Sequence, residues 1–387
     1  MRRDLFAHPH RSHPHRSRPH RSHPRRARRT AALAAALALA APAAVLGTPG
    51  AAAATPAGGR PGAGDAAGTL RVAADGSGDF RTVQAAVDAV PSGNTEPVTV
   101  SIAPGTYREH VEVPAGKPYI TFAGTGGSRE DTVIVYDTPS GEEKPGGGTQ
   151  GSTGSATVLI DADDFSAHSL AFVNDFDEAA HPGIDGPQAL AVKTTGDRIR
   201  FDDTAFKGNQ DTLMTNSPAL EEISRVYISD SFIEGDVDFV YGRATTVIED
   251  SLIRALDRGS DSNNGYITAA STWKDNPYGF LITDCRIVSD APDGTYHLGR
   301  PWHPSGDPDA VGQVLVRDTE LPAAIKDSPW TDMSGFPWEE ARFAEYENHG
   351  PGATVTPGRP QMSDAEAAEH ETGDYLAGSD GWAPHRS

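Results

Sequence analysis

A short pattern recurs along the second half of the chain and constrains the fold more than any other feature. Each copy is a run of alternating apolar and polar residues, then an Asp with a small residue after it, then a second short run. From one Asp to the next the distance is 20 to 34 residues, which is typical of solenoid coils joined by variable loops. The copies lie at 199–206, 226–233, 247–253, 280–287 and 314–321.

A solenoid explains this repetition better than a β-sandwich does. A sandwich is the alternative for a chain of many short strands, but it gives no reason for an Asp and a small residue at one place in every unit. In a right-handed parallel β-helix these residues would stack at one corner of successive coils. The stacking would also create the core that no single coil can bury alone. We therefore expect an all-β, single-stranded solenoid of this kind over residues 69–387.

Helical signals are confined to the two ends of this region. Apolar residues at helical spacing over residues 80–90 predict a short helix, and Pro91 ends it. We expect this helix to cap the N-terminal end of the solenoid, where open strand edges promote aggregation. Near the C-terminus, residues 363–366 read Ser-Asp-Ala-Glu, which predicts an N-cap and a helical tail packed against the solenoid.

Basic, apolar and small-residue segments follow one another at the start of the chain. Residues 1–30 are rich in Arg, His and Pro, residues 31–46 are apolar and rich in Ala, and residues 52–54 are all Ala. This order is typical of a secretory signal with a small-residue cleavage site, and the apolar stretch is too short for a comfortable membrane span. We therefore expect residues 1–54 to be an export signal and the mature protein to be extracellular.

The leader also leaves alternatives open. Arg pairs at 25–26 and 28–29 make twin-arginine export an alternative route. A tract rich in His and Arg can instead bind metal or nucleic acid. The basic region is long for a signal, so the start codon could lie further downstream. Residues 55–68 are rich in Ala, Gly and Pro and predict a disordered linker before the folded domain at 69–387.

The net charge of the chain indicates which kinds of partner it can bind. The net charge is −21, and the ten Arg and one Asp of the leader contribute +9, which leaves −30 for residues 55–387. Nucleic-acid binding needs patches of Lys and Arg, so we expect no nucleic-acid partner, and the same charge disfavours anionic membranes.

The lone Cys285 excludes an internal disulfide, so stability must come from a large core.

Three short motifs concentrate chemically useful side chains. They are Gly-Asn-Gln-Asp-Thr-Leu at 208–213, Gly-Asp-Val-Asp-Phe-Val-Tyr-Gly at 235–242 and His-Leu-Gly-Arg-Pro-Trp at 297–302. A single Asp in such a fold is more often a solvated turn residue, and a single Arg is more often a surface ion pair. Together, Asp211 and Asp238 with a carboxamide and an arginine provide acid–base and nucleophilic chemistry by carboxylates.

These motifs occur in the order of one known family. Together with further matching segments they resemble the pectin methylesterase (pectinesterase) family over residues 70–384. The resemblance implies a pectin-lyase-like, right-handed parallel β-helix that hydrolyses galacturonosyl methyl esters in pectin and releases methanol. It implies methyl-esterified pectin as the partner, no cofactor, no metal site and a monomeric enzyme. The further segments lie at 75–80, 155–157, 188–192 and 345–352.

The same resemblance assigns a role to each candidate residue. Asp238 would be the nucleophile that forms an acyl-enzyme, and Asp211 would protonate the departing methanol and then act as base on water. Gln188 and Gln210 would donate N–H groups to the oxyanion, and Arg300 would orient Asp238. The residues implied to contact the substrate are Thr157, Gln188, Tyr241, Arg300 and Trp302.

Elementary electrostatics predicts opposite protonation states for the two aspartates. A neighbouring arginine lowers the pKa of the carboxyl that it contacts, which would keep Asp238 charged. Mutual repulsion raises the pKa of the other, so Asp211 would remain an acid near neutrality, with titrations that belong to the pair. The carboxamide donors are neutral and so do not quench the nucleophile's charge.

The sequence also departs from the family pattern around the site. Met214 stands where an aromatic residue is common, Tyr241 replaces a usual Phe, and His297 replaces a usual Tyr. The stretch around 218–223 is longer than in familiar members and predicts a surface loop that could reshape the cleft.

Four alternative functions fit less well. A polygalacturonase activates water between two acids and would not need the two glutamines and Arg300. A pectate lyase needs acids that bind calcium and a basic catalyst. A serine esterase is disfavoured because the chain has no G-x-S-x-G motif, and the eight His after the leader show no metal-ligand spacing. A pectin-binding solenoid without activity remains the non-enzymatic alternative.

Overall fold

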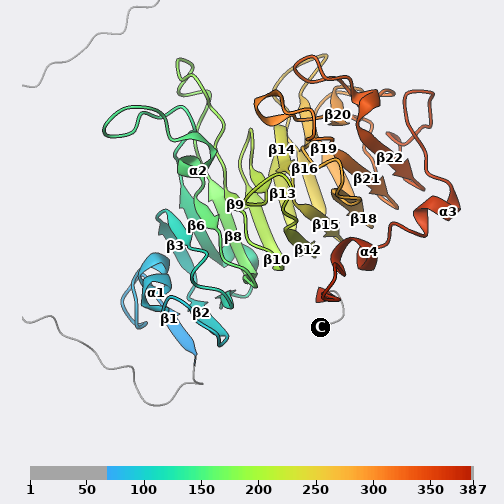
Figure 1. Ribbon diagram of the computed structural model, residues 1–387. Coiled ribbons are helices and arrows are strands. Elements are labelled where there is room, and N and C mark those ends of the chain that lie inside the picture. The colour runs from blue at the N-terminus through green and yellow to red at the C-terminus, as the bar shows by residue number, and fades with distance from the viewer. Residues whose placement is uncertain (1–67, 385–387) are drawn as a thin grey trace, which may run out of the picture. The chain divides into compact units, whose positions relative to one another are not determined.

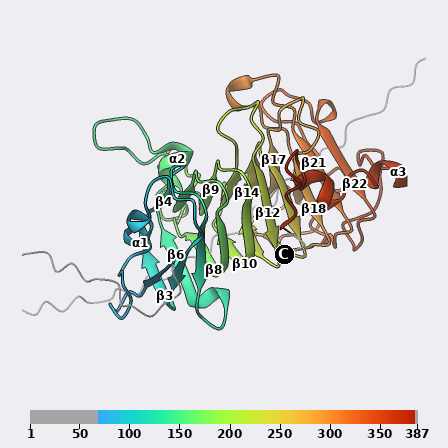
Figure 2. The same ribbon diagram turned by 60° about the horizontal axis from the view of Figure 1, so that its bottom comes forward.

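Parallel strands stacked in coils dominate the fold (Figure 1). The computed structural model describes residues 68–384. Its strands form a 15-stranded sheet and a 7-stranded sheet, and neighbouring strands within each sheet run parallel. Figure 2 shows β8, β10 and β12 side by side, as their registers require. This is the predicted parallel β-helix.

Each coil contributes strands to three faces. The main path of the larger sheet is β1 (Thr69–Val72), β2 (Val98–Ile102), β5 (Ile120–Gly124), β8 (Ser166–Asn174), β10 (Ile199–Lys207), β12 (Arg225–Ser229), β15 (Thr245–Glu249), β18 (Phe280–Thr283), β21 (Gln313–Arg317) and β22 (Arg342–Tyr346). Beyond a corner the sheet continues as β3 (Gly105–Arg108), β6 (Thr132–Tyr136), β13 (Phe232–Gly235), β16 (Leu252–Ala255) and β19 (Arg286–Ser289). The smaller sheet contains β4 (Val111–Val113), β7 (Val158–Ile160), β9 (Val192–Thr194), β11 (Leu213–Thr215), β14 (Val237–Gly242), β17 (Gly265–Ala270) and β20 (Tyr296–Gly299).

The repeated Asp forms the corner between the first two faces. Asp230 and its counterparts all have a positive φ between 48° and 52°, a conformation that Asp tolerates better than most residues. The small residue that follows points inward and bonds to the next coil: Thr204 and Ser231 hydroxyls lie 3.0 Å apart, and the Ser231 N–H donates to the Ser251 hydroxyl over 3.0 Å. The other corner residues of this kind are Asp203, Asp250, Asp284 and Asp318.

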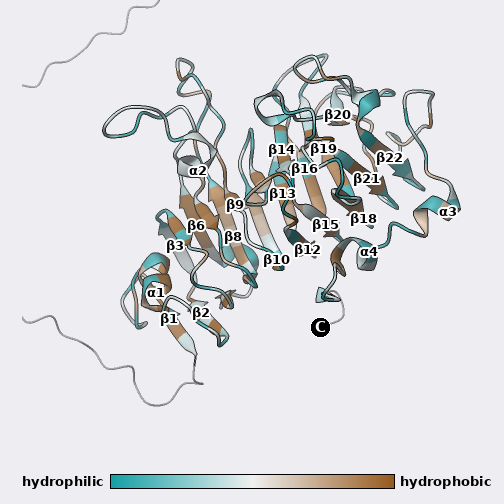
Figure 3. Cartoon of the chain, viewed as in Figure 1, coloured by the Kyte–Doolittle hydropathy of each residue, from teal (hydrophilic) through white to brown (hydrophobic). Residues whose placement is uncertain are grey.

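Apolar side chains from all three faces fill the inside of the coils. Figure 3 shows that hydrophobic residues gather in the strands and hydrophilic ones in the connections. Phe122, Phe165, Phe172, Phe201 and Phe206 are fully buried and form a ladder of ring contacts 5.0 to 6.1 Å apart along the axis. Stacking of like residues in successive coils therefore provides the core that the repeat predicted.

Helix α1 (Val83–Ala89) covers the first coil and contacts β1, β2 and β4. Figure 1 places it at the N-terminal end of the stack. It begins three residues later than the predicted 80–90, because Phe80 pairs with Val72 as an isolated bridge and Thr82 caps the helix through its side chain. Four α-helices occur within residues 68–384; the others are α2 (Gly151–Ser155), α3 (Asp364–Ala367) and α4 (Thr372–Leu376), with short 3-10 turns η1 (Arg129–Asp131), η2 (Pro304–Gly306) and η3 (Trp338–Glu340).

The C-terminal tail packs against the outside of the larger sheet. Ser363 and Glu366 form the capping box that begins α3, as predicted. In α4, Tyr375 and Leu376 complete a second apolar cluster, separate from the core, on the outward-facing row of β12, β15, β18 and β21. Its members from these strands are Tyr227, Val247, Leu281 and Leu315.

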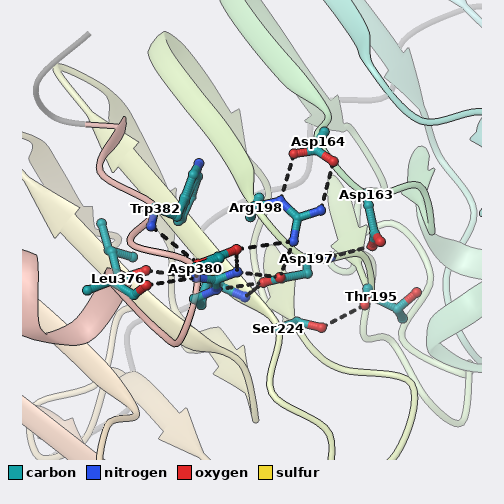
Figure 4. Close-up of polar contacts among 11 residues, drawn as sticks. Asp163, Asp164, Thr195, Asp197, Arg198, Ser224, Leu376, Asp380 and Trp382 are labelled. Atoms are coloured by element: carbon teal, nitrogen blue, oxygen red, sulfur yellow. Dashed lines mark hydrogen bonds and ion pairs between the residues drawn. The ribbon is translucent and has the colours of Figure 1, made fainter. Parts of the chain in front are cut away.

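A network of ion pairs fixes the tail beyond this cluster (Figure 4). Arg225 on β12 is 8 % exposed and donates to both Asp197 and Asp380, with nitrogen–oxygen distances of 2.6 Å in each pair. It also donates to the Leu376 carbonyl, and Trp382 lies against its guanidinium. Arg317 on β21 gives a second attachment, because it donates to the Ala367 and His370 carbonyls and pairs with Glu371 over 3.0 Å.

The predicted export signal (1–54) and linker (55–68) lie outside the described residues, apart from Gly68 at the start of the fold. In residues 68–384 no helix is long and apolar enough to cross a bilayer.

Candidate active site

A cleft of about 480 Å³ lies over the smaller sheet, and the predicted reactive residues meet in it. It is lined by Gln188, Gln210, Asp211, Asp238, Tyr241, Arg300 and Trp302, with further residues from neighbouring loops. These residues come from segments up to 114 positions apart in the sequence. The coils bring them together because β9, β11, β14, β17 and β20 are consecutive neighbours in the sheet.

Asp211 reaches the cleft from the turn between β10 and β11. Its φ of 67° lies in the left-handed region, and its backbone N–H donates to the Val237 carbonyl of the next coil over 3.0 Å. This bond places the turn of one coil beside the beginning of β14, on which Asp238 lies. Although they are 27 residues apart, the two aspartates are therefore on adjacent coils, as the repeat predicted.

Asp238 is turned toward the cleft by an irregularity in β14. The register between β14 and β17 shifts between Val237 and Val240, and Asp238 has a φ of 51°. Phe239 and Val240, which follow directly, both belong to the buried core. A bulge of this kind re-aims one side chain while the strand continues, so the Asp238 carboxyl leaves the core and enters the cleft.

Arg300 holds this carboxyl in a fork. Its Nε and Nη2 donate to the two oxygens of Asp238 over 2.8 and 2.5 Å, and the Asp238 side chain is 7 % exposed. The guanidinium also lies 3.8 Å from the ring centre of Tyr266, whose ring stacks on His297 at 5.2 Å. A bidentate pair backed by an aromatic face leaves the nucleophile candidate little freedom to rotate.

The two glutamines occupy adjacent coils: Gln210 directly precedes Asp211 in the same turn, and Gln188 lies on the preceding coil. The Ala189 N–H donates to the Gln210 carbonyl over 3.1 Å, which ties the segment of Gln188 to that of Gln210. Gln188 lies before β9, which begins at Val192, so the predicted strand at 188–192 starts later than expected. Both side chains line the cleft and can present carboxamide N–H groups to it.

Comparison with known proteins places this arrangement in a family. A family model described as Pectinesterase matches residues 69–379. The chain is 35 % identical over 339 residues to Pectinesterase A of Dickeya dadantii, covering 79 % of this chain and 88 % of that protein. The chain belongs to the pectinesterase family.

Solved structures agree with this assignment. Pectin methylesterase PemA from Erwinia chrysanthemi superimposes with a TM-score of 0.75 and 33 % identity, covering 83 % of this chain and 99 % of that one. A pectin methylesterase in complex with a hexasaccharide gives a TM-score of 0.73 at 33 % identity, with 81 % and 98 % covered. The prediction of a right-handed parallel β-helix is confirmed, and so is the prediction of a carboxylic ester hydrolase of the pectinesterase class.

Within this cleft, burial raises the pKa of both aspartates. For Asp211, burial and then the charge of Asp238 raise the pKa well above its ordinary value, as predicted. For Asp238, burial raises the pKa and the hydrogen bonds and charge of Arg300 lower it, with a net increase. The expectation that Arg300 would depress the pKa of Asp238 below its ordinary value is therefore wrong, because desolvation of a nearly buried carboxyl outweighs the ion pair. The pKa of Asp211 is nevertheless raised more than that of Asp238, so Asp211 is the weaker acid, as predicted.

Thr157 does not reach the cleft, which corrects the expectation of a substrate contact. Its side chain is fully buried and its hydroxyl donates to the Val173 carbonyl over 2.9 Å. Trp302 and Tyr241 do line the cleft, with ring centres 5.5 Å apart in an edge-to-face contact. Met214 is buried beneath them, and the longer stretch at 218–223 is absent from the cleft lining.

Several lining residues were not predicted from the sequence. Ser152, on helix α2, and Met333, in the loop before η3, close two sides of the cleft. No local pattern marks them, because they belong to connections between coils rather than to the repeat. Tyr266 does not line the cleft but supports Arg300. It could have been found from the repeat, since it pairs in register with His297 and Val237 on the neighbouring coils.

Proposed function

We propose that this protein is a pectin methylesterase that hydrolyses the methyl esters of galacturonate units in pectin and releases methanol. The observation that carries this proposal is the Asp211–Asp238 pair, with Arg300 bound to one member only, in a cleft of a pectinesterase fold. A relative of the same fold is named as a complex with a hexasaccharide, which supports an oligosaccharide as the occupant of the cleft.

In the first step, an oxygen of Asp238 attacks the ester carbonyl carbon. The carbonyl oxygen becomes an oxyanion, to which the N–H groups of Gln188 and Gln210 donate. When the intermediate collapses, the bond from the carbonyl carbon to the methoxy oxygen breaks, and Asp211 gives its proton to that oxygen. Methanol leaves, and the galacturonyl group remains joined to Asp238 as an acyl-enzyme.

In the second step, Asp211 is ionised and takes a proton from a water molecule. The hydroxide oxygen attacks the acyl carbon, and the bond to Asp238 breaks. The products are a free galacturonic acid, which gives its proton to solvent and becomes galacturonate, and the original Asp238 carboxylate, while Asp211 again carries a proton. The raised pKa of Asp211 favours the protonated form that the first step needs, and makes its carboxylate a stronger base for the second.

The remaining residues of the cleft would bind the sugar chain. Trp302 offers an aromatic face to one ring, Tyr241 forms the wall behind it, and Arg300 lies close enough to Asp238 to contact the reacting unit. We propose further that the enzyme is exported through its leader at 1–54, by the twin-arginine or the general route, and that it acts outside the cell as a monomer.

Methanol release from highly methylated pectin tests the proposal. Asp238→Asn and Asp211→Asn should each lower turnover by about 10⁴-fold or more, as for other groups that act as a unit in catalysis. Asp230→Asn is the matched control, because Asp230 has the same left-handed backbone on the coil of Asp238 but lies between β12 and β13, away from the cleft lining; it should keep full activity.

Two other results would indicate a different function. If no methanol appears and Asp238→Asn binds pectin as well as the wild type does, the protein is a pectin-binding solenoid. If new reducing ends or unsaturated products appear, it is a depolymerase. Turnover like that of the wild type in either aspartate variant would contradict the mechanism.

A further inference from the structure

The hydroxyl of Tyr241 is a polar group in the cleft that the mechanism above does not use. Tyr241 is 3 % exposed, and its hydroxyl is buried without a well-formed hydrogen bond. The Ser152 hydroxyl and the Asp211 carboxyl are the polar groups that face it. Burial, followed by the charge of Asp211, raises the pKa of Tyr241 well above its ordinary value, so the hydroxyl carries its proton throughout the working range of pH.

Packing does not account for this hydroxyl. Tyr241 is the strand partner of Met214, and its ring meets Trp302 edge to face. Phenylalanine is the usual residue at this place in the family that the sequence resembles, and its ring would make the same contacts. A buried hydroxyl that lacks a partner costs free energy that a phenylalanine would avoid. The group is therefore best explained by what it faces in the cleft.

We propose that Tyr241 is a positioning residue that acts through Asp211. Its O–H donates to one carboxyl oxygen of Asp211, which leaves the other oxygen to carry the proton and to face the methoxy group of the substrate. Ser152, on α2, donates in turn to the Tyr241 oxygen. This inference rests on the proposed function, because it assigns the acid step to Asp211.

The same hydrogen bond helps the second step. Once Asp211 has given up its proton, the Tyr241 O–H stabilises the carboxylate that must take a proton from water. The other groups that act on Asp211 are Asp238 and Asp236, which raise its pKa, and Arg300, which lowers it. Tyr241 acts in the same direction as Arg300 but adds no charge to the cleft.

Tyr241→Phe tests the proposal because it removes the oxygen and keeps the ring. We expect turnover on methyl-esterified pectin to fall about tenfold, as for the loss of one hydrogen bond, with little change in KM. We also expect the alkaline limb of the kcat/KM profile, where Asp211 loses its proton, to move to higher pH. The sign follows because removal of a donor destabilises the carboxylate and raises its pKa.

A second substrate separates positioning from a general loss of structure. Pectin esterified with trifluoroethanol has a leaving group that needs less help from an acid, so the loss caused by Tyr241→Phe should be several-fold smaller than with the methyl ester. Tyr227→Phe is the matched control, since this buried tyrosine donates to Glu249 on the outer face of the sheet. It should change neither the pH profile nor the dependence on leaving group.

The inference would be overturned if the alkaline limb of Tyr241→Phe stayed in place or moved to lower pH. It would also be overturned if this variant lost turnover equally with both esters. The result can also be told apart from failure of the proposed function. If the wild-type protein releases no methanol, the carboxyl of Asp211 can still be titrated by infrared or NMR spectroscopy in both proteins. Its pKa should be higher in Tyr241→Phe, and an unchanged value would overturn the inference without reference to activity.

Discussion

Asp211 and Asp238 have the same side chain, but their surroundings make them unequal. Burial raises the pKa of both, and only Asp238 has a bidentate partner to oppose that increase. Between the two apparent pKa values Asp238 is ionised while Asp211 keeps its proton, which is the state that the first step needs. A bell-shaped dependence of kcat/KM on pH follows, with limbs that belong to the pair.

Replacement of Arg300 should change one limb of this profile. Arg300→Gln removes the charge and the fork that lower the pKa of Asp238, so the acid limb should move to higher pH. Turnover should fall at least about 100-fold, because the proposed nucleophile also loses its orientation. Arg300→Lys keeps the charge but not the bidentate contact and should give a smaller shift. The measurement is methanol release as a function of pH.

Stability must be followed in the same experiment. A nearly buried Asp238 without its partner should cost about 3–5 kcal/mol above its pKa, so thermal unfolding shows whether Arg300→Gln is folded at each pH. Arg286→Gln, an exposed arginine paired with Glu320, is the control. An acid limb unmoved in a folded Arg300→Gln protein would contradict the role given to Arg300.

At the residue scale the sequence predicted which side chains meet but not their surroundings. The motifs placed Asp211, Asp238, Gln210 and Arg300 together because stacked coils bring matching positions into register. They could not predict the net pKa of Asp238, which depends on how completely the assembled coils exclude water. For Thr157 the direction of the side chain was missed, since it is set by its hydrogen bond to a backbone carbonyl one strand away.

At the scale of elements, the corner between the first two faces carries a column of like charges. Asp230, Asp250 and Asp284 occupy the same place in three consecutive coils. Burial, then the charges of Glu249, Asp284 and Asp230, raise the pKa of Asp250. The left-handed backbone explains why Asp recurs here, and the repulsion is a cost of that repetition.

Asp250→Asn should therefore stabilise the protein. Asn adopts the left-handed conformation as readily as Asp and removes one charge of the column, so the free energy of unfolding at neutral pH should rise by about 0.5 kcal/mol. Because the folded pKa of Asp250 is raised, the gain should be present above that pKa and vanish as the pH falls below the ordinary Asp range. Urea unfolding at neutral and acidic pH measures it.

A matched variant separates charge from backbone conformation. Asp250→Ala removes the same charge but places a residue at φ 49° that costs about 1–2 kcal/mol there, so it should be less stable than Asp250→Asn at every pH. If Asp250→Asn destabilises the protein at neutral pH, or if its gain persists in acid, repulsion along the corner is not the cause.

The C-terminal tail is a second element with its own stability. Asp380→Asn removes a carboxylate from Arg225, while the apolar contacts of α4 remain. We expect cleavage of the tail by a protease to become about fivefold faster, which corresponds to about 1 kcal/mol of local stability. Methanol release should not change, because no residue of the tail lines the cleft. A tail as resistant as that of the wild type would show that the packing of α4 and the contacts of Arg317 fix it without the Asp380–Arg225 pair.

The strands were largely predictable because the repeat requires successive coils to stack. A strand in one coil must have a partner at the same place in the next, so the runs at 199–206 and 226–233 predicted β10, β12 and β13 in register. Elements outside the repeat were less predictable. Helix α1 begins late because a bridge between Val72 and Phe80 competes with it, and the turn that becomes α2 is formed by Gly and Ser, which are weak helix formers.

At the scale of the whole molecule, charge links the protein to its proposed substrate. Residues 55–387 carry a net charge of −30, and each hydrolysed ester adds a negative charge to the pectin chain. A highly methylated chain is nearly neutral and approaches freely, whereas a demethylated chain is repelled over a distance set by the ionic strength. The enzyme should therefore prefer highly methylated pectin and release its product readily.

Measurements at different salt concentrations distinguish this long-range repulsion from substrate specificity that arises within the cleft. Between about 0.01 M and 0.1 M salt the screening length falls from about 30 Å to about 10 Å, so KM for sparsely methylated pectin should fall about threefold. KM for highly methylated pectin should hardly change, because that chain has little charge to screen, and it is the internal control. If preference for methylated pectin persists unchanged at high salt, it arises from contacts in the cleft. Activity that rises as methylation falls would show instead that local cations such as Arg300 outweigh the charge of the whole molecule.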